Sequence, residues 1–416
     1  MRTVEGSQKS LTFLLEKYGF LFVLLFCLGV FQPDLSSKSG LMELDFDKML
    51  SDKSGGSLKK QLFWIGFFIF FVIRFFFVKS LFSKSVLNKL YILSLFPIIA
   101  LASSFWAEYS SFVIKRSFFQ LCFIVTVFLS FYYCCRREGL YNSIYMAVVI
   151  VFLMSVLTIL MGTGFSASGA FSSYLSGKNL FAINLIVLVA LVVFLIKRYG
   201  VRKELVFMLI GLVALLVLSR SKTNIIILCF FFSLFFISFY VSKIIIYVLL
   251  FIILMVFVLV PFGSTSFGID WNPGMSMDPG ALTGRGFIWE TLYFDIKAFD
   301  KSFYGYGYGG YFNTGVVPFY FDDDFSFIKR ITSAHNGYLE LILQFGFFIS
   351  FLIFVVYIFL LKEMKESWQS ASLIIPVVNN VTESSFFRDQ NLIWLFCIVL
   401  IVTTCLRFDK DNNKFY

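Results

Sequence analysis

The chain has 416 residues, of which 59% are hydrophobic, 20% are aromatic and only 14% are charged. A water-soluble domain contains about a quarter of charged residues and a disordered chain contains few apolar ones, so both classes are excluded. Apolar runs such as 224–240 and 244–261 approach the length of about 20 residues that a spanning helix requires. They do not alternate apolar with polar residues, as a membrane β-barrel would. The sequence therefore predicts an all-α polytopic membrane protein.

Hydropathy predicts about twelve transmembrane helices. They are expected at 11–31, 61–78, 90–107, 112–131, 140–160, 180–196, 205–218, 223–240, 244–262, 336–361, 371–381 and 391–406. The chain then consists of helices 1–9 within residues 1–262, a loop at 263–334, and helices 10–12 with a tail within residues 335–416. Lys and Arg outnumber Asp and Glu in the loops on the side of the two termini, which places that side in the cytoplasm. This bias explains the net charge of +10 without a nucleic-acid partner.

The cysteines give no sign of a disulfide framework or a metal site. All seven lie in apolar runs or beside the basic pair Arg136-Arg137, without metal-ligand spacing. The one histidine cannot complete a zinc site alone. We therefore expect small buried cysteines, and neither a metal nor another cofactor.

The long loop at 263–334 lies on the outer side of the predicted topology. A connection of this length usually has a function, so we expect it to cap the bundle. Within it, the segment 286–300 has apolar residues at helical intervals, which predicts an amphipathic helix on the membrane surface or over the bundle. These residues are Ile288, Leu292, Ile296 and Phe299.

Two cations lie in a tight outer turn between the seventh and eighth predicted spans. Arg220 and Lys222 stand in the sequence Ser-Arg-Ser-Lys at 219–222, on the side that the charge bias disfavours. One interpretation is that their side chains reach toward lipid head groups, as is common at helix ends. The other is that they bind an anionic substrate.

Arg285 lies between two glycines, directly before the predicted amphipathic helix. A helix N-terminus offers free backbone N–H groups and a positive dipole end, and glycines allow a ligand to approach closely. An arginine there can form a diphosphate clamp, because its planar guanidinium matches two phosphate oxygens. An exposed loop arginine is the alternative interpretation.

His335 is the only histidine and lies at the start of the tenth predicted span, where Ser333 is a suitable N-cap. A histidine at the membrane–water border can accept a proton near neutral pH and so act as a general base. The alternative is a structural histidine at the interface.

Two further segments are rejected as nucleotide sites. The acidic run Asp322-Asp323-Asp324 could hold Mg²⁺ with a nucleotide sugar, but three consecutive acids favour a solvated turn. The glycine-rich segment Gly305–Gly310 does not follow a strand in a βαβ unit, which a dinucleotide fingerprint requires.

Taken in chain order, these positions resemble the bacterial O-antigen ligase and polysaccharide polymerase superfamily. The matching motifs span residues from about 95 to 405. They are Ser103–Ala107, Gly169–Phe171 with Lys178-Asn179, Ser219–Ser221, Thr283–Arg285 with Ile288-Trp289, Gly305–Gly310, His335–Leu339 followed by Gly346, and Thr382–Ser385. The glycine- and tyrosine-rich segment is more similar to exopolysaccharide polymerases than to ligases that act on lipid A core.

The resemblance implies the fold of a polytopic lipid-linked glycosyltransferase in the bacterial inner membrane, with its active site facing the periplasm. It implies a metal-independent, inverting transfer of a glycan from undecaprenyl diphosphate to an acceptor sugar. Arg220 and Arg285, assisted by Lys222, would bind the diphosphate, and His335 would be the base. The supporting residues carried by the motifs are Lys178, Asn179, Trp289 and Asn336.

Three alternatives remain open at this point. The acceptor can be lipid A core rather than another glycan, which would make the protein an O-antigen ligase. The protein can instead be a transporter or flippase for the lipid-linked glycan, or a scaffold. Transporters place ionisable groups at mid-bilayer in repeated halves, whereas here only Arg74 lies clearly in the middle of a predicted span. A scaffold would not require the Arg220, Arg285 and His335 set.

Overall fold

The computed structural model describes most of the chain outside the long outer loop. The described residues are 11–36, 58–79, 82–237, 248, 252, 285–312, 314, 332–361, 364, 366–406, 408–409 and 414–415. Within them the fold is helical, apart from a two-residue antiparallel strand pair, β1 (Phe408–Asp409) and β2 (Lys414–Phe415). The all-α prediction is confirmed for this part of the chain.

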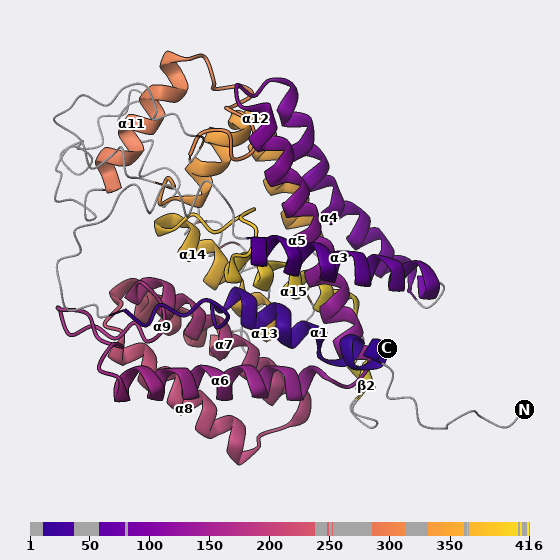
Figure 1. Cartoon of the computed structure of the whole chain (residues 1–416), viewed down its shortest axis with the longest axis vertical. Coiled ribbons are helices and arrows are strands. Elements are labelled where there is room, and N and C mark those ends of the chain that lie inside the picture. The colour runs from indigo at the N-terminus through magenta and orange to yellow at the C-terminus, as the bar shows by residue number, and fades with distance from the viewer. Residues whose placement is uncertain are drawn as a thin grey trace, which may run out of the picture.

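The helices follow the predicted order. They are α1 (Leu11–Cys27), α3 (Leu58–Val78), α4 (Lys84–Ala102), α5 (Ser110–Arg136), α6 (Leu140–Leu160), α7 (Lys178–Tyr199), α8 (Lys203–Leu218), α9 (Lys222–Ile237), α11 (Arg285–Ala298), α12 (Gly337–Leu361), α13 (Ser367–Ser372), α14 (Ile374–Thr382) and α15 (Leu392–Cys405). A short 3₁₀ turn, η2 (Ser103–Phe105), extends α4. Figure 1 shows α11 and α12 at the upper end of the molecule and α6 and α8 at the lower end.

Six of the described helices are long and apolar enough to cross a membrane. They are Leu58–Val78, Lys84–Phe105, Ser110–Arg136, Leu140–Leu160, Lys178–Tyr199 and Gly337–Leu361. The prediction of about twelve spans is therefore confirmed only in part. The ninth predicted span, 244–262, lies outside the described stretch apart from two isolated positions. The predicted eleventh span, 371–381, is replaced by the short helices α13 and α14, because the serines of 367–372 and the pair Asn379-Asn380 interrupt the apolar run.

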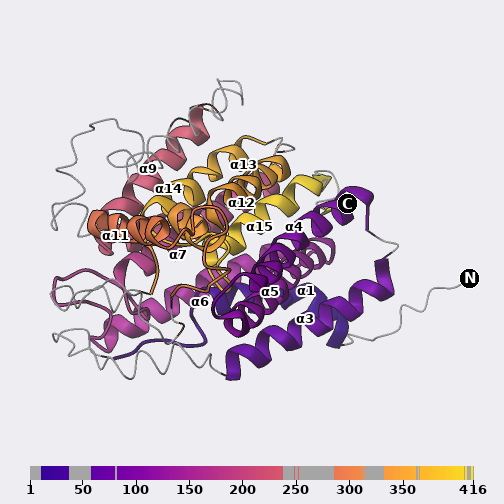
Figure 2. The same cartoon turned by 90° about the horizontal axis from the view of Figure 1, so that it is seen from above.

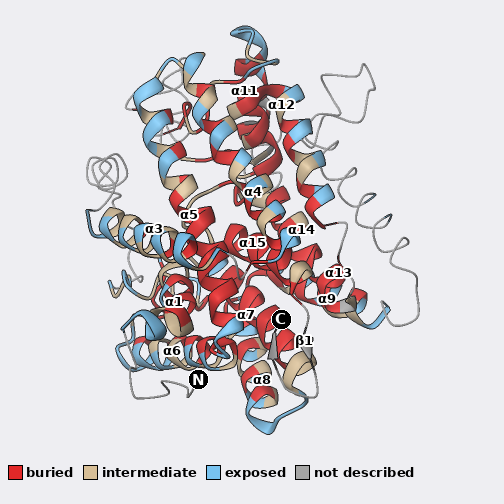
Figure 3. Ribbon diagram, turned by 90° about the vertical axis from the view of Figure 1, so that its right-hand side faces the viewer, coloured by how far each residue is buried: buried red, intermediate tan, exposed pale blue. Residues whose placement is uncertain are grey.

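The core is formed by α5, α7 and α15. An unbroken run from Phe181 to Leu195 is buried in α7, and all residues from Leu392 to Thr403 are buried in α15. Helices that are apolar on every side are buried in this way. Figure 3 shows the buried residues in red along these central helices, and Figure 2 shows α3 and α9 on opposite sides of them. The cysteines are all free, but Cys229 is exposed, contrary to the expectation that every cysteine is buried.

Contacts between loops agree with the predicted sidedness. Helix ends that the sequence assigns to the outer side contact one another through Asp34–Tyr174, Trp106–Tyr304 and Ser168–Arg220. Those assigned to the inner side are joined through Arg137–Glu16, Tyr141–Glu204 and Arg198–Glu366. Arg74, which lies in the interior of the second predicted span, donates to the buried carboxylate of Glu16. This ion pair ties α3 to α1, so Arg74 needs no transport role.

The long helix α12 is broken at Gly346, whose φ of 72° lies in the left-handed region. The break frees backbone carbonyls that must find donors inside an apolar bundle. The glycine-rich segment supplies them, because Tyr306 N donates to Leu343 O (2.8 Å) and Gly307 N to Gln344 O (2.9 Å). Gly305 has a φ of 66°, and a Cβ there would overlap the backbone at Gln344. The glycines are therefore a packing requirement beside the start of α12.

Candidate functional site

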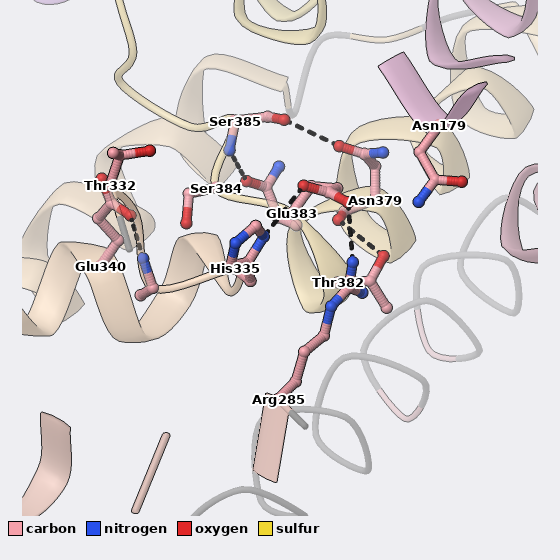
Figure 4. Close-up of polar contacts among 12 residues, drawn as sticks. Asn179, Arg285, Thr332, His335, Glu340, Asn379, Thr382, Glu383, Ser384 and Ser385 are labelled. Carbon is pink, nitrogen blue, oxygen red and sulfur yellow. Dashed lines mark hydrogen bonds and ion pairs between the residues drawn. The ribbon is translucent and has the colours of Figure 1, made fainter. Parts of the chain in front are cut away.

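Three charged or titratable side chains from separate elements meet at Glu383. Arg285 is the first residue of α11, His335 lies two residues before α12, and Glu383 caps the C-terminus of α14. Arg285 Nη2 lies 2.9 Å from Glu383 Oε1, and His335 Nδ1 lies 3.5 Å from Glu383 Oε2. Figure 4 shows the carboxylate between the guanidinium and the imidazole. We call these three residues the Glu383 cluster.

His335 is held by the way α12 begins. The helix starts at Gly337 and is capped by Asn336, whose Oδ1 accepts from Tyr338 N (3.0 Å) and Leu339 N (3.1 Å). The predicted cap, Ser333, is wrong, since the chain does not become helical until four residues later. An asparagine at the N-cap satisfies two free N–H groups of the first turn. Asn336, expected as a supporting residue, therefore fixes the position of its neighbour His335.

The backbone of His335 has a φ of 48°, in the left-handed region. A residue other than glycine in this region costs of order 1–3 kcal/mol and persists only where the surroundings impose it. The surroundings here include Glu340, whose Oε2 accepts from Ala334 N at 2.9 Å. Strained residues concentrate at functional sites, and His335 is one of seven described non-glycine residues with positive φ.

The two ring nitrogens of His335 have different surroundings. Nδ1 is buried, lies 3.5 Å from Glu383 Oε2 and makes no hydrogen bond, whereas the side chain as a whole is 37% exposed. The carboxylate therefore faces one nitrogen and leaves Nε2 for a proton from outside. This arrangement of a base oriented by an acid is the general pattern of proton-transfer sites.

Helix α11 places Arg285 by packing against α12. Ile288, Leu292 and Ile296 are buried in a cluster with residues at the start of α12, and Trp289 Nε1 donates to Ala334 O at 3.0 Å. The predicted amphipathic helix is thus confirmed, and it covers the bundle. Phe299 does not belong to its buried face, because α11 ends at Ala298 and this side chain is exposed.

The second predicted cation group lies in the turn between α8 and α9. Arg220 is exposed, has a φ of 52°, and its Nη1 donates to Ser168 O at 3.1 Å. Ser221 Oγ donates to Asn179 Oδ1 at 2.9 Å, which joins this turn to the start of α7. Lys178 and Lys222 are exposed first residues of α7 and α9. The helix dipole disfavours cations at these positions, so the dipole does not explain why three exposed cations lie here. We call Lys178, Arg220 and Lys222 the turn cluster.

The structure joins Arg285 to His335 through Glu383, but it does not join either residue to Arg220. No hydrogen bond or ion pair among the described residues connects the turn cluster to the Glu383 cluster. The two are on neighbouring elements, because α9 packs against α14. The acidic run Asp322–Asp324 lies outside the described residues, and within them no three His, Cys, Asp or Glu side chains come together around a possible metal position.

Glu383 is the residue that sequence reasoning did not assign a role. The segment Thr382–Ser385 matches a motif of the resemblance, yet its chemistry depends on contacts with residues 98 and 48 positions earlier in the chain. Asn379 and Asn380 hold this segment in place: Asn380 Oδ1 accepts from Ser385 N (3.0 Å), and Asn379 Oδ1 accepts from Ser385 Oγ (2.9 Å). The pair of polar asparagines in a predicted span was the available signal for a built site.

Comparison with known proteins gives one family. Residues 205–355 match the model of the O-antigen ligase family. The matched range contains Arg220, Arg285 and His335, whereas Glu383 lies beyond it. No curated protein and no solved structure gives a significant match to this chain. The resemblance to the O-antigen ligase and polymerase superfamily is thereby confirmed.

Proposed function

Because residues 205–355 match the model of the O-antigen ligase family, we propose that the protein is a multi-pass glycosyltransferase of the bacterial inner membrane. It transfers a glycan from undecaprenyl diphosphate to an acceptor sugar at the periplasmic face, in O-antigen or exopolysaccharide polymerisation. The observation that carries the proposal is the Glu383 cluster, in which a cation and a base are held 2.9 Å and 3.5 Å from one carboxylate.

The reaction is a single displacement at the anomeric carbon of the donor. The acceptor hydroxyl oxygen attacks this carbon from the face opposite the diphosphate, and its proton passes to Nε2 of His335. The bond from the anomeric carbon to the phosphate oxygen breaks, and undecaprenyl diphosphate leaves with the electron pair. The anomeric configuration is therefore inverted. One base and no carboxylate nucleophile are required.

Arg285 supplies the charge that the leaving group needs. Glu383 engages Nη2, and the other N–H donors of the guanidinium are available in a fixed planar fork. Cations placed before the reaction stabilise the developing negative charge without reorganisation, and this stabilisation is strongest where water is scarce. Arg285 is only 18% exposed. It can therefore act without a metal ion.

The turn cluster extends the anionic site. Arg220 and Lys222 are exposed on an element that packs against α14, and a lipid diphosphate carries two phosphate groups. We assign Arg220 and Lys222 to the diphosphate, with Lys178 and Asn179 supporting the turn. Association of the donor with both clusters would place its lipid tail along the bundle.

A second candidate is supported by the description of the matched family, which names O-antigen ligases. In that case the acceptor is lipid A core. A third candidate, a flippase for the lipid-linked glycan, is not favoured, because Arg74 is engaged by Glu16. Surface polysaccharide from a deletion strain separates the three. Single repeat units on the acceptor indicate a polymerase, full polymer retained on undecaprenyl diphosphate indicates a ligase, and repeat units trapped on the cytoplasmic face indicate a flippase.

The direct test is transfer by the purified protein in nanodiscs, supplied with a lipid-diphosphate glycan in buffer containing EDTA. We expect product with inverted anomeric configuration, and loss of product in Arg285→Ala. Full activity of Arg285→Ala would sink the diphosphate assignment. Activity that disappears with EDTA and returns with Mg²⁺ or Mn²⁺ would contradict a metal-independent reaction. Asp322–Asp324 would then be the first candidate metal ligands.

A further inference from the structure

A cavity lies near the Glu383 cluster, since it is lined by Glu340 and by residues that closely follow Glu383 in the chain. Its volume is about 160 Å³, and its walls come from α5, the glycine-rich segment, the first turns of α12 and the loop before α15. Its charged and aromatic lining includes Arg116, Arg388, Glu340, Asp389, Tyr308 and Phe387. The reaction proposed above assigns none of these residues a role.

The size of the cavity matches one sugar ring. A cavity of about 150 Å³ holds one benzene molecule, so 160 Å³ is of the order that one six-membered ring requires. Tyr308 is fixed on one wall, because its Oη donates to the carbonyl of Phe387. Aromatic walls with a polar end suit a ligand that has both apolar faces and hydroxyl groups, as a pyranose does.

The charges in the cavity balance and are held in place. Arg388 Nη2 donates to Thr332 O at 3.2 Å, and Arg116 Nη1 donates to Phe312 O at 2.9 Å. Glu340 and Asp389 carry two negative charges against the two positive charges of the arginines, so the four formal charges sum to zero. A ligand with its own charge would leave one pair uncompensated, whereas hydroxyl groups can donate to carboxylates and accept from guanidinium groups. The lining therefore fits a neutral ligand rich in hydroxyls.

Burial raises the pKa of the Asp389 carboxyl. A carboxylate that has lost water gains from any hydroxyl that donates to it, because its hydration has to be replaced. In the described structure Asp389 Oδ2 accepts from Gln390 Nε2 at 3.1 Å. A carboxylate has room for several donors, so the second oxygen has capacity for a ligand hydroxyl.

Two segments that line the cavity also lead to the Glu383 cluster. Glu340 lines it and also accepts from Ala334 N, next to His335. Phe387 and Asp389 follow Glu383 by four and six residues. Figure 4 shows His335 between Glu340 on one side and Arg285 on the other. An in-line displacement requires the acceptor hydroxyl and the diphosphate on opposite faces of the anomeric carbon, with the base beside the hydroxyl. A ring in the cavity and a diphosphate at Arg285 would come to His335 from different chain segments, which is compatible with that arrangement.

We propose that this cavity is the acceptor subsite and that it takes one neutral pyranose ring, whose hydroxyl is directed at His335. The proposal rests on the glycosyl transfer proposed above and specifies where the acceptor binds. It assigns Glu340, Asp389, Arg116 and Arg388 to hydroxyl recognition.

Binding is measured without reference to catalysis, by saturation-transfer NMR on the full chain in nanodiscs. The probes are methyl glycosides of glucose, galactose and N-acetylglucosamine, with methyl glucuronide as the charged comparison. We expect at least one neutral glycoside to bind. Glu340→Gln preserves an acceptor for Ala334 N, and Asp389→Asn preserves the shape, so each should weaken binding by about tenfold or more through loss of a charge-assisted hydrogen bond.

The matched control is Gln32→Ala, which alters a separate cavity near the end of α1 and should leave the NMR signal unchanged. The subsite is refuted if no neutral glycoside binds, if only the glucuronide binds, or if both cavity variants bind as the wild type does while remaining folded. Binding of a neutral glycoside by a wild-type protein that transfers no glycan would refute the proposed function alone. The two failures are therefore distinguishable.

Discussion

Glu383 Oε2 and His335 Nδ1 face each other across 3.5 Å, although the two residues are 48 positions apart in the chain. The other oxygen of the same carboxylate holds Arg285 at 2.9 Å. One acidic side chain therefore fixes both the proposed base and the proposed diphosphate clamp. This relationship makes Glu383 a positioning residue, since it acts through the groups on either side and not on the substrate.

Glu383→Gln should lower kcat by about 10- to 100-fold, less than the 10²–10⁴-fold that the general base itself contributes. The amide cannot hold a protonated imidazole and a guanidinium as a carboxylate does. The KM for the lipid-diphosphate donor should change little, because Arg285 remains. Steady-state kinetics in nanodiscs provide both constants. Glu366→Gln is the control, since Glu366 pairs with Arg198 on the opposite side. Equal changes in kcat for the two variants would contradict the positioning role of Glu383 and leave it a structural role only.

The second prediction concerns Arg220, which has positive φ and an exposed side chain. Asparagine tolerates this backbone region, so Arg220→Asn should fold normally. It should raise the donor KM by about 10- to 100-fold, the worth of a charge-assisted phosphate contact. Arg220→Lys should keep only part of the wild-type affinity for the donor, since an ammonium lacks the planar fork of a guanidinium. Arg202→Asn, at the opposite end of α8, should have wild-type kinetics. A normal donor KM in Arg220→Asn would remove the turn cluster from the site.

The third prediction tests the break in α12. Gly346→Ala would place a Cβ against the carbonyl of Phe303 at a φ of 72°. Backbone strain and overlap together should cost about 2–4 kcal/mol and lower the thermal unfolding midpoint in detergent. Gly66→Ala is the control, because Gly66 is exposed in α3 with open space around it. It should be neutral or stabilising by up to about 1 kcal/mol. Similar midpoints for both variants would show that the break is not required.

The fourth prediction is a pH dependence of stability from Asp295. Burial raises the pKa of this carboxyl, and a hydrogen bond from Tyr311 only partly offsets the shift. The folded protein then binds more protons than the unfolded one above the ordinary Asp pKa of about 3.9. The free energy of unfolding should therefore fall as pH rises from that value through the folded-state pKa. Thermal unfolding in detergent at a series of pH values above about 4 measures this slope.

Asp295→Asn should flatten the slope and raise stability at neutral pH, because the neutral amide can still accept from Tyr311. Asp300→Asn changes an exposed residue just beyond the same helix and should keep the wild-type slope. If Asp295→Asn retained the full slope, another group would be responsible.

Hydropathy predicted the helices well because each helix buries its own backbone polar groups and its position depends on local sequence alone. Tertiary contacts could not be predicted from the sequence. Arg74 stands within a predicted span, and its partner Glu16 belongs to another helix. The polar pair Asn379-Asn380 could not be interpreted from hydropathy, because its side chains hold the segment that follows α14 by accepting hydrogen bonds from Ser385.

In the candidate site, too, local sequence identifies some residues and only tertiary packing identifies the others. His335 and Arg285 could be selected from residue type and from their position at helix starts. Glu383 could not, because a lone glutamate in Thr-Glu-Ser-Ser has no local feature that distinguishes it from a surface acid. Its partners are fixed by the packing of α11 against α12 and of α12 against α14. The glycine-rich segment was likewise recognised as a motif, but its role in satisfying the carbonyls at Leu343 and Gln344 depends on the break in α12.

The last prediction concerns His335. His335→Asn suits the left-handed backbone at φ 48° and removes the base. Turnover should fall by about 10²–10⁴-fold, while the donor KM stays close to the wild-type value because Arg285 and Arg220 bind the diphosphate. Only a neutral imidazole accepts a proton. The wild-type kcat should therefore decline on the acid side, and His335→Asn should lack this decline.

The control for the position itself is Asn336→Ala. This variant removes the cap of α12 and should cost about 1 kcal/mol of stability, with kcat reduced far less than in His335→Asn. The contrast separates loss of the base from loosening of the segment that carries it. A His335→Asn enzyme with near wild-type turnover and an unchanged acid limb would exclude His335 as the base. Glu340, which lies one turn into α12 and lines the proposed acceptor cavity, would then be the carboxylate to test.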